Sequence, residues 1–431
     1  RIGRRKLLLI GAAAFGVTSI LAAFADSAEM LIVARALLGV SAATLAPSTL
    51  SLIRNMFLNP RERTTAIGIW VASYSAGAAL GPVFGGFLLT HFWWGSVFLI
   101  NVPVMFLILF LGPLLLPEFR DPKAGKIDIP SALLSLCSVL AIIYGVKHAA
   151  QDGFQHQHLA VIALGIVLMG LFVMRQKRLA DPMIDLSLFR APVFSAALLA
   201  NIMGLFVALG SFLLIAQYLQ LVIGMDPLTA GLWTAPSGIV FILGSVFAPM
   251  IVRHFRPSTV MAVGFALAAV GFSVMARGAA TDHFALFIGG FWVFCAAMAP
   301  IGTLATDIIM TAAPAERAGS VSAISETAAE LGGATGIAVL GSILTAIYRQ
   351  ELHSLLPESA PSGWSGKATD TLAAALHIAH EVPGEMGTAL ADAARMAYIS
   401  GFNNTLMVGV GVLIGLSLLA LTLLRRTEQH R

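Results

Sequence analysis

The chain has 431 residues, of which 58% are hydrophobic and only 11% are charged, whereas a soluble domain has about 25% charged residues. This composition excludes an ordinary soluble enzyme and predicts an integral membrane protein. The formal net charge is +4. Because most basic residues flank apolar stretches, we expect this charge to set the orientation of membrane spans and not to bind nucleic acid.

Twelve apolar segments are each long enough to cross the ~30 Å hydrocarbon layer of a bilayer as an α-helix. They cover residues 6–25, 29–53, 65–89, 96–116, 129–147, 158–174, 193–222, 228–252, 258–276, 284–311, 319–347 and 400–424. If residue 1 is cytoplasmic, roughly four-fifths of the 26 Lys and Arg residues fall on the cytoplasmic side. This positive-inside bias predicts that both ends of the chain are cytoplasmic.

A short repeat relates the two halves of the chain. The sequence PRER at residues 60–63 precedes one predicted span, and PAER at residues 314–317 precedes another, 254 residues further along. The spans that follow are both rich in Gly and Ala, which allow helices to pack closely. Because both copies have the same position and orientation, they predict two parallel bundles, as in transporters built from repeated units.

Residues 349–399 form the longest predicted loop, and the orientation puts this loop outside the cell. Residues 368–382 and 384–398 are expected to form two short amphipathic helices, broken at Pro383 and Gly384. Two interpretations stay open. The loop is either a solvated hairpin that covers the ends of the spans or a lid over an exit path.

The segment of residues 316–348 combines apolar length with two acidic residues, Glu326 and Glu330. Four residues apart on an α-helix, their side chains share one face about one turn apart. In a structural alternative the helix begins only at Leu331, which would leave both glutamates in water. The repeat argues against this alternative, because it aligns the glutamates with Ala72 and Ala76 inside the matching span.

Carboxylates inside a membrane are costly and usually face a cavity that takes part in transport. Burial favours the protonated form of a carboxyl group, and two close carboxyl groups titrate in separate steps. A cation that enters the same cavity favours the ionised form and displaces a proton. We therefore predict that Glu330, together with Glu326, couples proton binding to cation binding.

Three stretches in chain order resemble motifs of the major facilitator superfamily. The first is similar to the end of the cytoplasmic loop signature G-x-L-x-D-R-x-G-R-K/R and contains Arg1, Gly3, Arg4 and Arg5. The second resembles the fourth-helix motif, with Leu38 in place of the usual Gln, and contains Leu31, Arg35, Gly39, Ala42 and Ala43. The third matches the antiporter motif of the fifth helix at every position, with Gly77, Gly81, Pro82, Gly85 and Gly86.

Further stretches resemble the fourteen-span drug:proton antiporter branch of this family. Trp94, Phe98, Asn101 and Pro103 are similar to an element in which Gly95 here replaces a common Arg. Residues 182–190 and 217–220 resemble stretches typical of efflux pumps for quaternary ammonium compounds and methyl viologen. The resemblance covers essentially the whole chain.

The resemblance implies an all-α polytopic membrane protein with the major facilitator fold. Twelve transmembrane helices of an expected fourteen are present, in two pseudo-repeated bundles with two extra central helices. Because the chain opens directly ahead of a span and has no initiator Met, we expect it to lack the first two helices. The predicted domains are an N-terminal bundle (1–116), a linker region with the two extra helices (117–192), and a C-terminal bundle (193–431).

The resemblance also implies roles for individual residues. The family assigns the position of Arg35 a part in proton transfer, whereas the residue alone also fits an arginine that extends to the membrane interface. The antiporter-motif helix is implied to seal the cavity and to favour export over uptake. Embedded polar and aromatic side chains offer a possible substrate cavity suited to flat cations, and these are Tyr74, Trp233, Asn201, Gln217 and Tyr218.

The sequence therefore predicts a secondary active transporter and not an enzyme: a proton-coupled exporter of lipophilic cations in a bacterial cytoplasmic membrane. Two alternatives stay open, an exporter of neutral or anionic metabolites, lipids or siderophores, and a non-transporting sensor or assembly protein on a transporter scaffold. No P-loop is present and the 10 histidines show no metal-ligand spacing, so we expect no metal and no cofactor beyond a proton gradient. The expected partners are small lipophilic cations, protons and the lipid bilayer, without nucleic acid, and we expect a monomer.

Overall fold

The computed structural model describes residues 3–57, 59–118, 128–152, 155–179, 182–311, 318–356, 368–382 and 384–424. Within these ranges 11 helices are long and apolar enough to cross a membrane, and each coincides with a predicted span. The other predicted span, residues 65–89, lies in a helix whose described apolar part is Leu80–His91. The all-helical prediction is confirmed for the described ranges, and the count of twelve spans stays a prediction.

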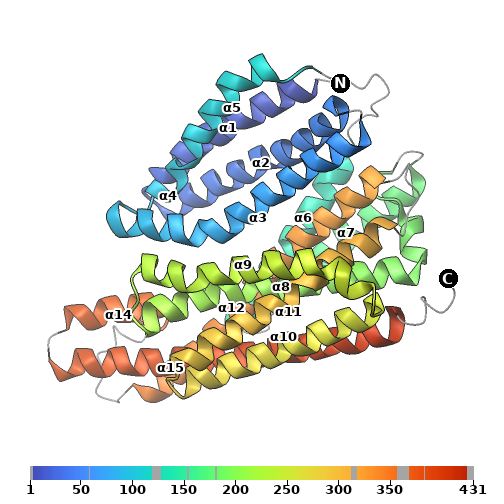
Figure 1. Ribbon diagram of the computed structural model, residues 1–431. Coiled ribbons are helices and arrows are strands. Elements are labelled where there is room, and N and C mark those ends of the chain that lie inside the picture. The colour runs from blue at the N-terminus through green and yellow to red at the C-terminus, as the bar shows by residue number, and fades with distance from the viewer. Residues whose placement is uncertain are drawn as a thin grey trace. The chain divides into compact units, whose positions relative to one another are not determined.

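Contacts within the chain divide it into two compact units. Unit 1 comprises Arg1–Lys126 and Asp226–Gly238. Its helices are α1 (Arg4–Ala23), α2 (Ala28–Met56), α3 (Pro60–His91), α4 (Ser96–Leu99), α5 (Asn101–Leu115) and the first part of α9 (Pro227–Val252). Within this unit α1 packs against both α2 and α5 (Figure 1).

Unit 2 comprises Ile127–Met225 and Ile239–Arg431. Its elements are α6 (Ile129–Asp152), α7 (His156–Arg178), the 3-10 turn η1 (Leu186–Arg190), α8 (Pro192–Gln217), the π-helical turn η2 (Tyr218–Val222), the rest of α9, α10 (Pro257–Ala280), α11 (Phe284–Thr311), α12 (Ala318–Leu355), α14 (Leu372–Glu381), α15 (Glu385–Leu419) and the π-helical turn η4 (Ala420–Leu424). The helices α6 and α7, which the sequence predicts as the extra pair, form a hairpin, and α6 also packs on α12.

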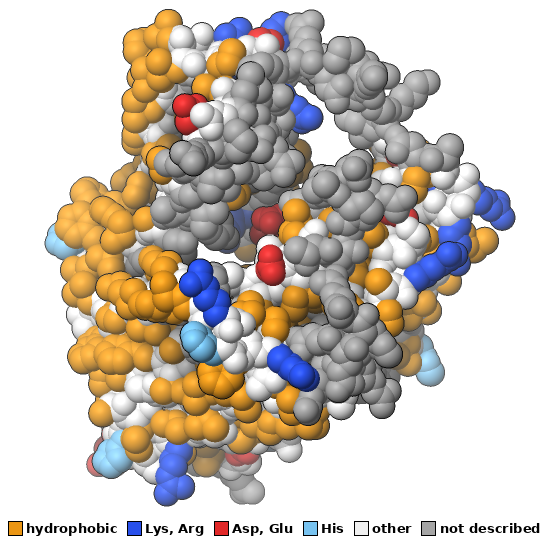
Figure 2. Space-filling view, turned by 45° about the vertical axis from the view of Figure 1, so that its right-hand side comes forward, with side chains coloured by type: hydrophobic (Ala, Val, Ile, Leu, Met, Phe, Trp, Pro, Cys, Tyr) orange, Lys and Arg blue, Asp and Glu red, His pale blue; other side chains and the backbone are white. Residues whose placement is uncertain are grey.

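Much of the described surface is hydrophobic. Figure 2 shows apolar side chains over most of the described part of one face, and large apolar residues such as Ile32, Phe106 and Leu114 are each more than two-thirds exposed. In a soluble protein this much exposed apolar surface would cause aggregation. It is expected of helices whose outer faces contact lipid.

Glycine residues let α8 and α12 approach each other backbone to backbone. A Cβ atom on Gly336 would lie 2.1 Å from the carbonyl oxygen of Phe206, and one on Gly332 would lie 2.3 Å from that of Ile202. From the other side, a Cβ on Gly210 would lie 2.7 Å from the carbonyl carbon of Gly336. Small residues allow membrane helices to gain van der Waals contact along their whole length, so this contact fixes which face of α12 is packed.

The prediction for residues 349–399 is partly wrong. The helix α12 continues to Leu355, and α15 runs without a break from Glu385 to Leu419, so the second short helix is the beginning of the last span. At 1.5 Å per residue, the 38 residues of α12 extend ~57 Å, well beyond a ~30 Å hydrocarbon layer. A separate short helix, α14, is confirmed, and it packs on α15.

The contact between α8 and α12 makes a testable prediction. In Gly336→Ala, the new methyl group overlaps the backbone of α8, and we expect a loss of about 1–3 kcal/mol of stability from overpacking. The matched control is Gly341→Ala in the same helix, where no described atom lies within 4 Å of the added Cβ and Ala favours the helix by about 1 kcal/mol. Thermal unfolding in detergent should separate the two variants, and equal unfolding temperatures would contradict this account.

Candidate functional site

Glu326 and Glu330 lie well inside α12, which begins at Ala318. The alternative that the helix starts only at Leu331 is therefore wrong. Both residues fall in the apolar stretch Ile324–Leu355, which is long enough to cross a membrane. Both side chains are exposed.

In the part of α12 that carries the glutamates, residues 321–337, the contact with α8 and the glutamates lie on different faces of the helix. Val321, Ala328, Gly332 and Gly336 are buried and recur at intervals of seven and four residues, so they form one face of the helix. Glu326, Glu330 and Ile337 recur at intervals of four and seven and are exposed. At 100° per residue these two faces are about half a turn apart, so packing against α8 turns both carboxylates away from the core of unit 2.

In unit 1, Arg35 lies on α2 about 10 Å from its first residue, at 1.5 Å per residue. Its guanidinium carbon lies 5.5 Å from the ring centroid of Phe98 in α4. This distance is within the range of a cation–π contact, which the ring quadrupole favours. The structure thus brings together the fourth-helix motif and the element that begins at Trp94.

A close backbone contact explains the glycine that replaces a common arginine in that element. A Cβ atom on Gly95 would lie 2.0 Å from the carbonyl oxygen of Ala23, so any larger residue would push α1 away. Nearby, the Asn101 side chain donates a hydrogen bond of 3.3 Å to the Ser19 hydroxyl. These contacts join the starts of α4 and α5 to α1.

The loop-motif residues bind the chain just after α5. The backbone N–H of Arg5 donates to Glu118 Oε1 at 3.2 Å, and its guanidinium donates to the carbonyl oxygen of Leu116 at 3.0 Å. Gly3 adopts a positive φ of 105° beside the Glu118 carboxylate, where a Cβ atom would clash with that side chain. Arg4 is half-buried at the first position of α1, and Arg1 lies outside the described residues.

Only some glycines of the antiporter motif make a close helix contact. A Cβ atom on Gly86 would lie 2.5 Å from the carbonyl oxygen of Pro227 at the start of α9, and one on Gly231 would lie 2.4 Å from that of Pro82. Gly77, Gly81 and Gly85 have no described atom within 4 Å of such a Cβ. The motif therefore supplies one end of α3 with a tight contact to α9, inside unit 1.

Of the residues predicted to line a substrate cavity, Gln217 and Tyr218 lie next to each other in unit 2. Tyr218 is 2% exposed, and its ring stacks on Phe287 and Phe402 at centroid distances of 4.4 and 5.2 Å. Tyr218 thus packs in the core of unit 2 in this structure, and its role in substrate binding stays a prediction. Gln217 accepts a hydrogen bond of 3.3 Å from the Tyr398 hydroxyl, which also ties it to helix packing.

The other three residues predicted to line a cavity lie on α8, α9 and α3. Asn201 is half-buried on α8 in unit 2, and Trp233 is exposed on the first part of α9 in unit 1. The backbone of Tyr74 lies in α3, and its side chain lies outside the described residues. A role of these residues in substrate binding stays a prediction.

Two contact residues were missed by the sequence reasoning. Glu118 and Gly231 hold the loop motif and the antiporter motif, respectively. An acidic residue directly after an apolar span is a weak signal for Glu118, and nothing local distinguishes Gly231 from the other glycines of membrane helices. Their partners lie more than one hundred residues away along the chain, which local patterns do not reveal.

Comparison with known proteins decides the family. The profile described as the Major Facilitator Superfamily matches residues 1–337. The chain belongs to the major facilitator superfamily. It is therefore a multi-pass membrane transporter and not an enzyme.

Curated relatives of this chain are efflux and resistance proteins from bacteria. The multidrug efflux pump LfrA of Mycolicibacterium smegmatis is 44% identical, over 95% of this chain and 81% of that protein. The methyl viologen resistance protein SmvA of Salmonella typhimurium is 34% identical, over 93% and 80% respectively. The tetracenomycin C resistance and export protein of Streptomyces glaucescens is 29% identical, over 98% and 79%.

Solved structures with the same fold include other transporters. The chain matches a bacterial homolog of the human lysosomal transporter Spinster, in an inward-facing and unoccupied conformation, with a TM-score of 0.66, 17% identity and coverage of 99% of this chain and 84% of that one. A peptide transporter POT in complex with sulfate matches with a TM-score of 0.57, 16% identity and coverage of 96% and 81%. At these identities the matches show the fold alone.

The antiporter motif yields a prediction that separates neighbouring glycines. Gly86→Ala places a methyl group against the backbone of α9, and we expect it to cost about 1–3 kcal/mol of stability by overpacking. The adjacent Gly85→Ala meets no described atom and serves as the matched control, with no loss expected. Thermal unfolding of purified protein measures both, and a larger loss for Gly85→Ala would contradict the contact.

Proposed function

We propose that this transporter exports lipophilic cations in exchange for protons, and that Glu330 and Glu326 carry the coupling. The supporting observation is the position of the two carboxylates, one turn apart on the exposed face of α12 and inside an apolar stretch long enough to span a membrane. Carboxylates within a membrane span are energetically costly, and those that occur there usually take part in transport. Two of the relatives are a multidrug efflux pump and a methyl viologen resistance protein, and this supports drug export and this substrate class.

The proposed cycle uses competition at the carboxylates. A cation enters from the cytoplasm and favours the ionised form of Glu330 or Glu326, so a proton leaves. The two bundles then change their access to the opposite side, the cation departs, and protons from outside reload the carboxylates. Because the same carboxylates bind the cation and the proton in turn, the inward movement of protons drives the outward movement of the cation without ATP.

Unit 1 has two roles in this proposal. Arg35 assists proton transfer, and the contact of α3 with α9 at Gly86 seals the cavity on one side. Both roles are implied by the family resemblance of these motifs. We place the protein in the bacterial cytoplasmic membrane, with twelve spans and both ends of the chain cytoplasmic, because the basic residues are biased to that side.

A second candidate is the export of neutral or anionic metabolites, with the glutamates coupling protons without touching the substrate. The relative named for tetracenomycin C export supports keeping this candidate. The two candidates differ in one measurable property, since only direct competition makes cations release protons from the carboxylates.

The test uses everted membrane vesicles that contain the full-length protein and a pH-sensitive dye. Adding methyl viologen or benzalkonium should release protons, and a neutral drug should not. We expect Glu330→Gln to reduce the signal to that of vesicles without the protein, and Glu326→Gln to reduce it partly. The matched control is Glu351→Gln, which makes the same chemical change near the end of the same helix and should leave the signal intact.

Two outcomes would reject the mechanism. If cation export stays unchanged in both Glu326→Gln and Glu330→Gln, the carboxylates do not couple transport. If a neutral drug releases protons as well as the cations do, and Glu330→Gln abolishes both signals, the second candidate replaces the first.

A further inference from the structure

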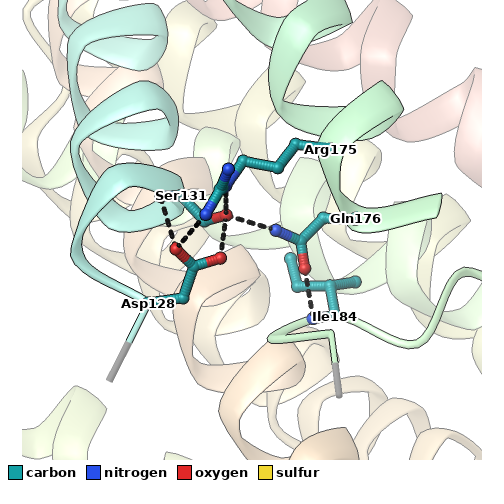
Figure 3. Close-up of polar contacts among 5 residues, drawn as sticks. All are labelled: Asp128, Ser131, Arg175, Gln176 and Ile184. Atoms are coloured by element: carbon teal, nitrogen blue, oxygen red, sulfur yellow. Dashed lines mark hydrogen bonds and ion pairs between the residues drawn. The ribbon is translucent and has the colours of Figure 1, made fainter. Parts of the chain in front are cut away.

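A group of polar side chains joins the ends of α6 and α7 (Figure 3). The Arg175 guanidinium lies 2.8 Å from Asp128 Oδ1 and donates to the Ser131 hydroxyl oxygen at 3.1 Å. The Ser131 hydroxyl in turn donates to Asp128. Gln176 donates to the same Ser131 oxygen at 2.8 Å, so this oxygen is shared by both residues of α7.

This group is a permanent contact and not a pH switch. The hydrogen bond from Arg175, followed by that from Ser131, lowers the pKa of Asp128 from 3.8 to about 2. Because the folded-state pKa is below the ordinary value, the stabilisation is complete above pH 3.8 and is lost only as the pH falls through about 2. At neutral pH Asp128 is therefore ionised and able to pair with Arg175.

Gln176 extends this group to a third segment of the chain. Its side chain is 2% exposed, and its Oε1 accepts a hydrogen bond of 3.3 Å from the backbone N–H of Ile184, as Figure 3 shows. Ile184 belongs to the connection that leads from α7 through η1 to α8. One buried amide thus fastens this connection to the hairpin of α6 and α7.

The fastened connection packs against the beginning of α12. Ile184 and the buried Leu188 belong to an apolar cluster that also contains Val321, Ile324 and Ala328 of α12. These three residues lie on the packed side of α12, in the same turns that carry Glu326 on the other side. Since α6 also packs directly on α12, the hairpin reaches the glutamate-bearing helix by two routes.

We propose that Gln176 is a positioning residue through which the α6–α7 hairpin holds the first turns of α12, and thereby the orientation of Glu326 and Glu330. The functional part of this statement rests on the proposed function, in which these carboxylates carry the coupling. The physical part does not depend on it. In this proposal the extra helices α6 and α7 hold α12, the helix that carries the two glutamates, in place.

The size of the effect follows from the hydrogen bonds involved. Loss of one hydrogen bond costs about 1 kcal/mol, and a buried partner left unsatisfied costs about 1–3 kcal/mol. A free energy of about 1 kcal/mol changes an opening equilibrium about fivefold. Removal of the Gln176 amide leaves the Ile184 N–H without its acceptor, so the connection should detach more often from the hairpin.

The test measures how often the packed side of α12 opens. Ala328 is 6% exposed and contacts the cluster, so Ala328→Cys reports opening through its rate of labelling by a maleimide. The full-length protein carries this reporter in detergent, with Cys137 and Cys295 replaced by serine. We expect Gln176→Leu to raise the labelling rate about fivefold.

The hairpin itself provides a matched control. The Ser138 hydroxyl donates a buried hydrogen bond of 2.8 Å to the carbonyl oxygen of Gly165, which also links α6 to α7 but lies away from the connection. Ser138→Ala should weaken the hairpin by a similar amount and leave the labelling rate at position 328 unchanged. Because the clamp holds the orientation of the two glutamates, Gln176→Leu should also lower the export rate. Gln176→Glu keeps an acceptor for the Ile184 N–H but loses the donor to Ser131, so it should restore the protection of position 328 and the export rate in part.

If Gln176→Leu does not fold, Ile184→Ala tests the same link, because it trims the contact with the cluster and leaves every polar group paired. Unchanged labelling in Gln176→Leu and Ile184→Ala, or an equal rise in Ser138→Ala, would overturn the proposal. Normal transport by both Glu326→Gln and Glu330→Gln would reject the coupling mechanism, but it would not alter the labelling result. Failure of the clamp and failure of the proposed function are therefore distinguishable.

Discussion

The backbone contact between α8 and α12 is the constraint on which the candidate site depends. Gly210, Gly332 and Gly336 remove the side chains that would keep the two helices apart, so one face of α12 is committed to packing. Glu326 and Glu330 are then left on the opposite face, away from the core of unit 2. A carboxylate enclosed in that core without partners would cost several kcal/mol. The glycines therefore decide where the charges are tolerated.

A backbone contact at glycine residues also joins two helices in unit 1. Gly86 and Gly231 bring α3 and the first part of α9 into backbone contact, while no carboxylate occurs on the matching turns of α3, where the repeat places Ala72 and Ala76. One repeated helix thus uses its small residues to close against a neighbour. The other uses them to orient charge. In the proposed function, the first contact belongs to sealing and the second to coupling.

The hairpin of α6 and α7 adds a polar contact to this apolar framework. Hydrogen bonds join Asp128, Ser131, Arg175 and Gln176, and the buried Gln176 amide also accepts from Ile184, so its oxygen and nitrogen both have partners, as buried polar atoms require. Polar contacts have directional geometry, whereas apolar packing allows small sliding movements. A network at the ends of two helices is therefore suited to hold the connection to α8, and with it the start of α12, in one register.

The sequence by itself determined the membrane class, most of the helical spans and the position of two glutamates on one helical face, because hydropathy and helical periodicity are local properties. The family was indicated by the resemblance of its motifs. The sequence did not reveal that the second predicted short helix is the beginning of α15, because the signals for a helix break before residue 385 do not show how far the next helix runs. Only the tertiary structure decided that Tyr218 packs in a core, that Gly86 and not Gly85 makes a close contact, and that Gln176 reaches Ile184. These outcomes depend on which distant segments pack together. The sequence around a residue does not identify the distant residue that it will contact in the packed structure.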